Sequence, residues 1–359
     1  MSAPIARRLA RRLSRPHTVM EVCGGQTHSI VRWGLDQLLP PGLRLIHGPG
    51  CPVCVTPAAT VDGAIALART PGVILCSYGD MARVPGTRPG EDLLEARAAG
   101  GDVRLLTSPL QALALAQSAP ERQVVFLAVG FETTAPATAL LARQTLALGL
   151  PNLSLLTAHV RVAPAMEAIL AEPANQVEAF LAAGHVCSVL GTAELEALVA
   201  RFQVPVVVTG FEPDDVMAGL WQAVDLLEAG RIEVANAYPR VVRPEGNPAA
   251  RALLEEVFQP IDQPWRGLGP IPAGGLALRP PYDALDARRR FPFLPSPEAA
   301  DDLPCPTCGP VCISGAILQG RATPEACAAF GTACTPDHPL GAPMVSSEGA
   351  CAAWYRYRR

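Results

Sequence analysis

The chain contains no lysine, and all 29 of its basic residues are arginine. This absence excludes the P-loop lysine of nucleotide-binding enzymes, a Schiff-base lysine and a lysine general base. The net charge of −4 provides no large basic field, which argues against a dedicated nucleic-acid-binding protein. The five arginines between residues 6 and 16 are better explained as the solvated face of an amphipathic helix than as a nucleic-acid arm.

Long apolar segments are also missing. The longest apolar runs, such as the one that starts at Val124, have the length of strands and fall well short of the roughly 18 residues of a membrane span. The arginine-rich start is not followed by the apolar region of a signal peptide. With 359 residues, of which 49% are hydrophobic, the chain is long enough for two or three domains. We therefore expect a soluble cytoplasmic protein with no membrane contact.

The middle of the chain has the pattern of an α/β fold. Short apolar runs predict buried parallel strands, and alanine- and leucine-rich stretches of helical period lie between them. The tripeptide G-F-E follows two of these runs, at 130–132 and 210–212, so both turns are predicted at the carboxyl ends of strands, where α/β sheets bind ligands. The predicted strands cover residues 72–78, 123–129, 153–157, 185–190 and 204–209.

Beyond about Tyr238 proline and glycine become frequent and the strand signals fade. Such a segment usually wraps other domains or is held by something other than a large core. The chain has 11 cysteines, which is too many for packing alone in a reducing compartment, so they indicate metal, cluster or thiol chemistry. The middle of the chain is poor in cysteine, with only Cys187. The early group consists of cysteines 23, 51, 54 and 76, and the late group of cysteines 305, 308, 312, 327, 334 and 351.

The late group is suited to an iron–sulfur cluster. Cys312, Cys327, Cys334 and Cys351 are separated by 14, 6 and 16 residues, which is unlike the tight knuckles of zinc sites. Four widely spaced thiolates favour a [4Fe-4S] cluster, although structural zinc and unligated thiols stay open as alternatives. Cysteines 305, 308 and 312 form C-x-x-C-x-x-x-C, the reverse of the radical-SAM order, so no radical chemistry is predicted.

The early group combines C-G-G-Q-T-H, which contains Cys23 and His28, with G-P-G-C-P-V-C, which contains Cys51 and Cys54. The first motif predicts a thiol on a turn after a short strand. The C-x-x-C pair, in a loop that we predict to be neither helix nor strand, has the spacing of thiol-disulfide oxidoreductases. Residue chemistry alone leaves redox or assembly work and a structural zinc site equally open.

Taken in order, E-V-C-G-G-Q-T-H, G-P-G-C-P-V-C, G-F-E-T-T-A-P, F-G-T-A-C-T-P and M-V-S-S-E-G-A-C resemble the motifs of the HypD family of hydrogenase maturation factors, from about Met20 to the C-terminus. The resemblance implies a cytoplasmic scaffold with redox-active thiols, rather than a turnover enzyme, on which the Fe(CN)2(CO) unit of [NiFe]-hydrogenases is assembled. It implies a HypC-type small chaperone and a HypE-type cyanide donor as partners, and no nucleic acid or membrane. A general thiol-disulfide oxidoreductase and a zinc-stabilised interaction module are the alternatives.

The resemblance also assigns residues. It implies that Cys23, Cys51 and Cys54, with His28 nearby, are the essential thiol site for iron binding and redox work. Ser314 and Pro343 stand where the family pattern has cysteines. The family-pattern cysteines that remain would hold a [4Fe-4S] cluster that serves in electron transfer; they are Cys312, Cys327, Cys334 and Cys351. Either Cys305 or Cys308 could take the place of Cys312.

The resemblance predicts two Rossmann-like α/β domains with parallel sheets and a C-terminal iron–sulfur region. We place the first domain at residues 1–120, with the thiol motifs, and the second at 121–237, with G-F-E-T-T-A-P. The Pro/Gly-rich cluster region, at 238–359, is expected to wrap both.

Some motif residues have two interpretations. Glu132, Thr133 and Thr134 either line the cleft that faces the thiols or cap the following helix. His159 and His185 follow predicted strands and either approach the site or are buried histidines with satisfied hydrogen bonds, which is the more common case.

Two further cysteines and one loop are expected to be structural. Cys76 and Cys187 lie in apolar runs and are predicted to be core residues. Ser346, Ser347 and Glu348 have no accompanying catalytic His/Asp pattern, so we expect them to shape the cluster loop.

Overall fold

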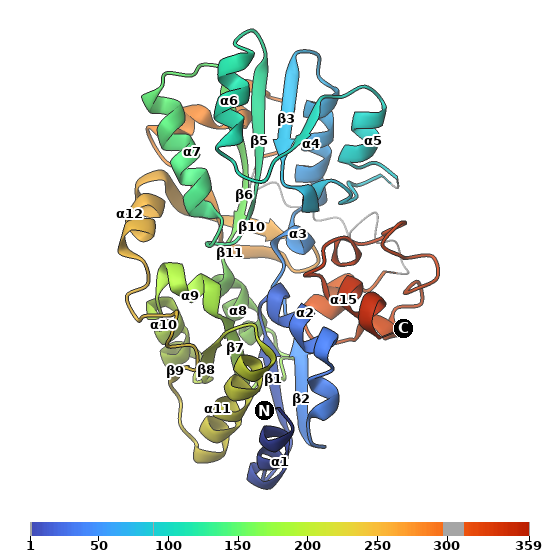
Figure 1. Cartoon of the computed structure of the whole chain (residues 1–359), viewed down its shortest axis with the longest axis vertical. Coiled ribbons are helices and arrows are strands. Elements are labelled where there is room, and N and C mark those ends of the chain that lie inside the picture. Colours follow the sequence, from blue (N-terminus) through green and yellow to red (C-terminus); the bar gives the residue numbers. More distant parts are fainter. Residues whose placement is uncertain (1, 89, 297–311, 359) are drawn as a thin grey trace.

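The computed structural model describes residues 2–88, 90–296 and 312–358 (Figure 1). Its first sheet, sheet A, is parallel throughout and has the strand order β2-β1-β7-β8-β9. Helices α1 and α11 pack together on one of its faces, and their apolar side chains form a core with Val19, Leu181 and Val207. The strands are β1 (His17–Glu21), β2 (Leu43–His47), β7 (Ala179–Ala183), β8 (Val206–Thr209) and β9 (Val234–Asn236).

Sheet B has six strands in the order β10-β11-β6-β5-β3-β4. Four of them are parallel, and the β10–β11 hairpin adds to β6 in the antiparallel sense. All the residues of β5 except the first are buried, as expected for a central strand that is covered on both faces. The strands are β3 (Val73–Ser77), β4 (Val103–Leu105), β5 (Gln123–Gly130), β6 (Leu153–Val160), β10 (Phe258–Trp265) and β11 (Gly269–Leu278).

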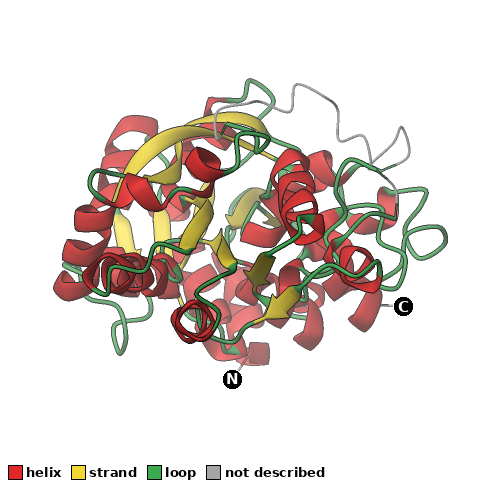
Figure 2. Cartoon of the chain, turned by 90° about the horizontal axis from the view of Figure 1, so that it is seen from above, coloured by secondary structure: helices red, strands yellow, loops and turns green. Residues whose placement is uncertain are grey.

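Helices surround the strands of both sheets, as the view from above shows (Figure 2). This arrangement, with parallel strands linked through helices, is the α/β class predicted from the sequence. The arginine-rich start forms α1, as expected. The longer helices are α1 (Ser2–Arg12), α2 (Gly24–Trp33), α4 (Ala58–Arg69), α6 (Gln111–Ser118), α7 (Ala135–Ala147), α8 (Val162–Ala171), α10 (Ala193–Phe202), α11 (Pro213–Ala229), α12 (Pro248–Val257) and α15 (Ala350–Tyr357). The shorter ones are α3 (Pro52–Val55), α5 (Leu93–Ala98), α9 (Gly184–Leu190), α13 (Ala287–Arg290) and α14 (Ser314–Leu318), with 3-10 turns η1 (Asp36–Leu38), η2 (Gly79–Met81), η3 (Tyr282–Leu285), η4 (Pro324–Ala326) and η5 (Ala342–Met344).

The sheets group the chain differently from the domain ranges expected from the sequence. Sheet A joins strands from residues 17–47 to strands from 179–236, and sheet B joins residues 73–160 to the hairpin of 258–278. The chain therefore leaves the first sheet after α3, builds most of the second, and returns through α8. A boundary at residue 120 would separate β3 and β4 from β5, to which β3 is hydrogen-bonded. Composition along the chain cannot reveal this, because strand pairing depends on long-range contacts.

The carboxyl ends of the parallel strands in both sheets point toward the middle of the molecule. In Figure 1, β1 rises from the N-terminus toward the centre, while β5 and β6 descend toward it. Both G-F-E turns lie at these ends, since one follows β5 and the other follows β8, and helices α7 and α11 come next, as predicted. The two sheets thus present their ligand-binding edges to one another.

Three local expectations were wrong. Residues 185–190 form helix α9, and the strand is the preceding alanine-rich β7. The hairpin β10–β11 lies in the segment where strand signals had faded. The loop with the C-x-x-C pair contains the short helix α3, because a proline is well suited to the first helical position, where its missing N–H is not needed.

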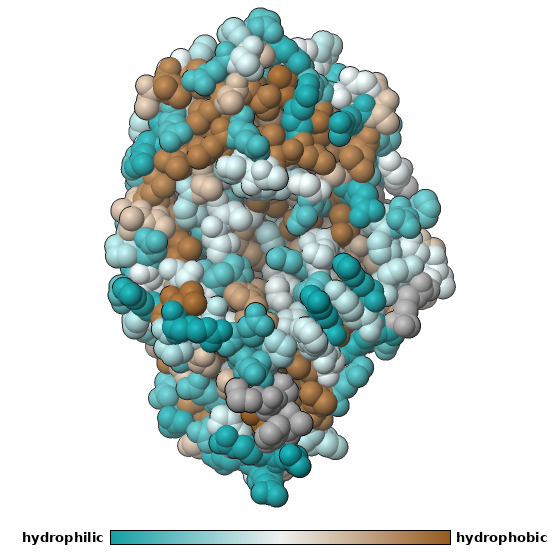
Figure 3. All heavy atoms as spheres, viewed as in Figure 1, coloured by the Kyte–Doolittle hydropathy of each residue, from teal (hydrophilic) through white to brown (hydrophobic). Residues whose placement is uncertain are grey.

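The described parts of the region expected to wrap both domains, residues 238–296 and 312–358, reach both sheets. Residues 258–278 form the β10–β11 hairpin of sheet B, and helix α15 packs against α2 beside sheet A (Figure 1). The last segment also meets the half of the molecule that holds sheet B, since Arg83 donates a hydrogen bond to the carbonyl of Pro336. On the face seen in Figure 3, apolar residues gather over the part of the molecule that holds sheet B. Among the described helices none is both long and apolar enough to cross a bilayer.

Candidate thiol site and cysteine cluster

Cys23 lies where β1 ends and α2 begins. It is the N-cap residue of α2, with an extended backbone, and only 2% of it is exposed. Both glycines that follow are needed for close packing: a Cβ on Gly24 would come within 2.4 Å of the Cβ of Glu348, and one on Gly25 within 3.1 Å of Phe211. The C-G-G sequence therefore allows the C-terminal segment and the second G-F-E turn to approach this thiol.

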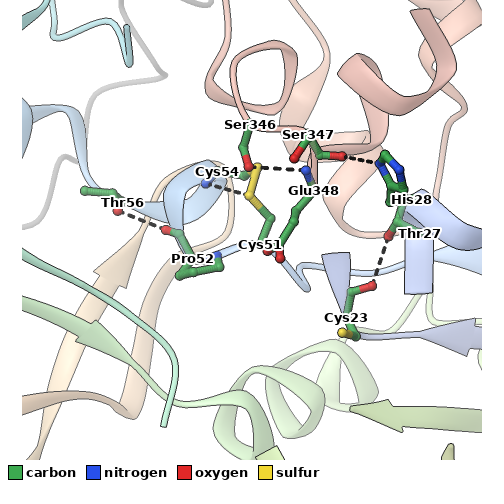
Figure 4. The surroundings of a disulfide bond; sticks show 10 residues. All are labelled: Cys23, Thr27, His28, Cys51, Pro52, Cys54, Thr56, Ser346, Ser347 and Glu348. Atoms are coloured by element: carbon green, nitrogen blue, oxygen red, sulfur yellow. Dashed lines mark hydrogen bonds between the residues drawn. A yellow bond between two sulfur atoms is a disulfide. The ribbon is translucent and has the colours of Figure 1, made fainter. Parts of the chain in front are cut away.

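The G-P-G-C loop packs directly on the backbone of Cys23. The carbonyl of Gly50 accepts a hydrogen bond from the Gly24 N–H (2.6 Å), and a Cβ on Gly50 would lie 2.2 Å from the Cys23 nitrogen. Cys51 and Cys54 then form a disulfide, with their Cα atoms 5.3 Å apart (Figure 4). The three cysteines predicted to act together are therefore held in one region at the carboxyl edge of sheet A.

A histidine that the sequence left undecided joins this region. The Nδ1 atom of His185, in the first turn of α9, lies 3.7 Å from the Cys23 sulfur. Burial lowers the pKa of His185 to about 4, so its imidazole is neutral near pH 7. Burial also raises the pKa of Cys23, opposed by the amide of Gln26 and reinforced by the charge of Glu21. The pair is therefore a protonated thiol beside a neutral imidazole.

His28 lies near the thiol site, on the side of the C-terminal segment. Its Nδ1–H donates to the carbonyl of Ser347 (3.1 Å), and its Nε2 accepts from the Tyr357 hydroxyl (3.3 Å). Figure 4 shows the ring turned toward the C-terminal segment, away from the disulfide. His28 thus fastens α2 to the C-terminal segment, and both of its ring nitrogens are engaged there.

The loop of residues 346–348 covers the thiol site from the C-terminal side. The hydroxyl of Ser346 accepts a hydrogen bond from the Glu348 N–H (3.2 Å), and the Glu348 side chain extends toward Cys51 and Cys23 (Figure 4). Glu348 keeps contact with solvent, while partial burial and then the charge of Asp80 raise the pKa of its carboxyl. This loop, expected to shape the cluster region, also borders the disulfide.

The four late cysteines assemble around one apolar cluster. Cys327, Cys334 and Cys351 are each at most 9% exposed and pack with Ile317 and Met344. Burial, followed by the charges of the other three cysteines of the group, raises the pKa of Cys351, which shows that Cys312 also lies near. The sulfur of Cys334 accepts a backbone N–H from Leu340 (3.4 Å). The two replacement candidates, residues 305 and 308, lie outside the described residues.

This donor set fits a [4Fe-4S] cluster in kind and number. Three of the thiols are buried in one apolar cluster with Cys312 near them, and a backbone N–H points at one of the sulfurs, as is typical of iron–sulfur sites. In the described ranges no three His, Cys, Asp or Glu side chains are arranged around a single metal ion. A [4Fe-4S] cluster does not require its thiolates to converge on one metal ion, because each thiolate binds a separate iron.

The first G-F-E turn buries an unpaired carboxylate oxygen. Glu132 is 2% exposed; its Oε1 accepts the Val162 N–H (3.0 Å), and its Oε2 has no hydrogen-bond partner among the described residues. Burial raises its pKa to about 7. It borders a cavity of about 180 Å³ together with Arg161 and Glu194. The hydroxyl of Thr134, at the N-cap of α7, donates to the Phe131 carbonyl rather than accepting a helical N–H.

The remaining candidates are core residues. His159 is fully buried in β6, where its Nδ1–H donates to the Gly130 carbonyl and its Nε2 accepts from the Thr138 hydroxyl. Burial lowers the pKa of His159 to about 4 and raises the pKa values of Cys76 and Cys187 to about 12. Cys76 lies in β3 as predicted, and Cys187 lies in a helix, α9, although we had placed it in a strand.

Comparison with known proteins agrees with the motif pattern. The family model described as "HypD: Hydrogenase formation hypA family" matches residues 2–358. The chain is 46% identical to the hydrogenase expression/formation protein HupD of Azotobacter chroococcum mcd 1, over 99% of this chain and 94% of that protein. It is also 46% identical to the hydrogenase maturation factor HypD of Rhizobium leguminosarum bv. viciae (96% and 89% covered) and 44% identical to that of Escherichia coli (strain K12) (99% and 92% covered).

Proposed function

Because the chain belongs to the HypD family of hydrogenase maturation factors, we propose that it is the scaffold and redox protein on which the Fe(CN)2(CO) unit of [NiFe]-hydrogenases is assembled. The observation that carries this proposal is the meeting of the Cys23 thiol, the Cys51–Cys54 disulfide and the four-cysteine C-terminal segment in one region. A HypC-type chaperone and a HypE-type cyanide donor are its proposed partners. It acts in the cytoplasm as a scaffold rather than as a turnover enzyme.

Cys23 is the proposed first ligand of the iron that is being assembled. Iron that carries cyanide and carbon monoxide is electron-rich, and a soft thiolate binds it firmly while remaining exchangeable. The thiol must lose its proton when iron binds. The imidazole of His185, 3.7 Å from the sulfur, lies near enough to relay that proton to solvent, but with a pKa of about 4 it does not keep the proton at neutral pH.

Cys51 and Cys54 are the proposed redox couple. Reduction of their disulfide takes up two electrons and two protons and yields two thiols, which then become further iron ligands beside Cys23. Glu348 is the carboxyl that extends toward this pair (Figure 4). When bound, a [4Fe-4S] cluster held by the four late cysteines would supply electrons one at a time. Those residues are Cys312, Cys327, Cys334 and Cys351.

A general thiol-disulfide oxidoreductase is the second candidate, and the observed C-x-x-C disulfide at the start of a helix is the feature that favours it. Turnover distinguishes the two. A general reductase reduces unrelated protein disulfides catalytically, whereas the scaffold is inert toward them until its small chaperone partner is present.

The decisive measurement is infrared spectroscopy of the protein purified without oxygen together with its chaperone partner. We expect CN and CO stretching bands in the wild type, their loss in Cys23→Ala, and their retention in the control Cys76→Ala, a cysteine buried in β3. Visible absorption of the cluster should disappear in Cys334→Ala but persist in Cys23→Ala. Unchanged bands in Cys23→Ala would remove this residue from the iron site. A colourless protein that contains zinc would instead support an interaction module and refute the scaffold.

A further inference from the structure

We propose that Glu21 and His47 are positioning residues that hold Cys23 in place and couple it, through Trp354, to the C-terminal helix α15. Neither residue was a candidate in the sequence. The inference rests on the proposed role of Cys23 as an iron ligand, but it concerns the protein before iron binds. Its evidence is a continuous chain of hydrogen bonds.

Glu21 is the centre of this chain. It is the last residue of β1, it is fully buried, and its carboxylate accepts three hydrogen bonds. Oε2 accepts from the Cys23 backbone N–H (2.8 Å), while Oε1 accepts from His47 Nδ1 (2.6 Å) and from the Thr27 hydroxyl. A buried carboxylate is tolerated only when donors satisfy it, so all three donors are held in fixed positions around it.

These donors belong to the segments that carry the thiols. Cys23 and Thr27 are at the start of α2, and His47 ends β2, directly before the loop that leads to Cys51. Glu21 therefore ties the backbone that supports Cys23 to the backbone that supports the C-x-x-C pair. The contact between Gly50 and the Cys23 backbone is a second link between these two segments.

His47 extends the chain to the C-terminal segment. Its Nε2 lies 3.5 Å from the indole nitrogen of Trp354. An indole N–H can only donate, so His47 Nε2 accepts, and its proton stays on Nδ1, which donates to Glu21. One tautomer of the imidazole thus links Trp354 to Glu21.

Trp354 lies on α15, three residues after Cys351, and residues at this spacing share a side of a helix. The guanidinium of Arg358 stacks over its ring at 4.2 Å and forms an ion pair with Asp36, which anchors the end of the chain near sheet A. A displacement of α15 at Cys351 is therefore transmitted through Trp354, His47 and Glu21 to the Cys23 backbone.

A labelling experiment tests this coupling without iron. The oxygen-free protein is treated with iodoacetamide, and the labelling rate of Cys23 is read from its peptide by mass spectrometry. Trp354→Phe keeps an aromatic ring, smaller than the indole, but removes the N–H donor, and Glu21→Gln keeps the shape but removes the charge. We expect each substitution to raise the labelling rate of Cys23 about fivefold. The increase in the double variant should be well below the product of the two single increases, because both substitutions break the same chain of hydrogen bonds. Trp33→Phe, on an exposed tryptophan of α2, is the matched control and should leave the rate unchanged.

A Cys23 labelling rate in Trp354→Phe equal to that of the wild type, or effects that simply multiply, would overturn the coupling. Circular dichroism identifies any variant that fails to fold. If Glu21→Gln does not fold, Trp354→Phe decides the test, because it leaves the buried carboxylate in place and keeps an aromatic side chain on α15. The infrared bands provide a second readout, since loss of the Glu21 charge should shift the CN and CO frequencies in Glu21→Gln. If no bands exist in any protein, the iron proposal fails while the labelling result still decides the coupling.

Discussion

Replacing Glu132 with glutamine should stabilise the protein at pH 8 by about 3 kcal/mol and change its stability by less than about 1 kcal/mol at pH 5. The carboxyl is buried after β5, and within the part of the chain that the structure describes its Oε2 has no hydrogen-bond partner. Glutamine has nearly the same shape, stays neutral at every pH, and keeps an oxygen that can accept the Val162 N–H.

The magnitude follows from the pKa of Glu132, which burial raises from its ordinary value of 4.5 to about 7. Below pH 4.5 the carboxyl is protonated in both the folded and the unfolded chain, and its contribution to folding is fully present. As the pH rises from 4.5 to 7, the unfolded chain ionises first, so stability is progressively lost. Above pH 7 the loss is complete and amounts to about 3 kcal/mol. A glutamine at position 132 does not ionise, so the variant does not undergo this loss of stability.

Urea unfolding followed by tryptophan fluorescence at pH 5, 6, 7 and 8 measures this difference. The free energies of unfolding of wild type and Glu132→Gln should diverge as the pH increases. Glu121→Gln, which changes an exposed carboxylate before β5, should follow the wild type at every pH. Parallel curves for wild type and Glu132→Gln would show that Glu132 ionises normally and would refute the reasoning.

Two further predictions concern the core and the thiol site. His159→Gln should reduce the loss of folding free energy on acidification between pH 6.5 and 4. Burial lowers the pKa of His159 to about 4, so the wild type loses about 3 kcal/mol of stability over this range as the unfolded chain takes up the proton first. Urea unfolding of both proteins at several pH values measures the difference, and identical pH dependence below pH 6.5 would contradict it. Gly50→Ala should lower the melting temperature and increase Cys23 labelling, because its Cβ would lie 2.2 Å from the Cys23 nitrogen. The control Gly79→Ala, whose Cβ would meet no described atom within 4 Å, should melt as the wild type does. Equal melting temperatures for both variants would show that the G-P-G-C loop adjusts freely.

The α/β class and the position of the G-F-E turns could be predicted from the sequence because they depend on local patterns. Apolar runs of strand length alternate with helical stretches, and glycine ends two of the runs. The membership in the HypD family also followed from ordered motifs and is confirmed. Such signals lie within a few consecutive residues, so no knowledge of distant contacts is needed.

The grouping of strands and the partners of the thiols were not predictable in this way. The run at 185–190 is as apolar as a strand, yet it is helix α9, because the adjacent β7 already fills the place between β1 and β8. The contact between His185 and Cys23 joins residues 162 positions apart, and the contact between His28 and Ser347 joins residues 319 positions apart, so neither can be read from neighbouring residues.

The sequence by itself determined the α/β class, the two groups of cysteines and the turns at the strand ends, since each is written in neighbouring residues. Only the tertiary structure decided that β1 pairs with β7, that Cys23 lies beside His185, and that Glu21 joins His47 and Trp354. The Trp354–His47 contact spans 307 positions of the chain. Its formation depends on how whole sheets and helices bury their apolar faces, which no local pattern encodes.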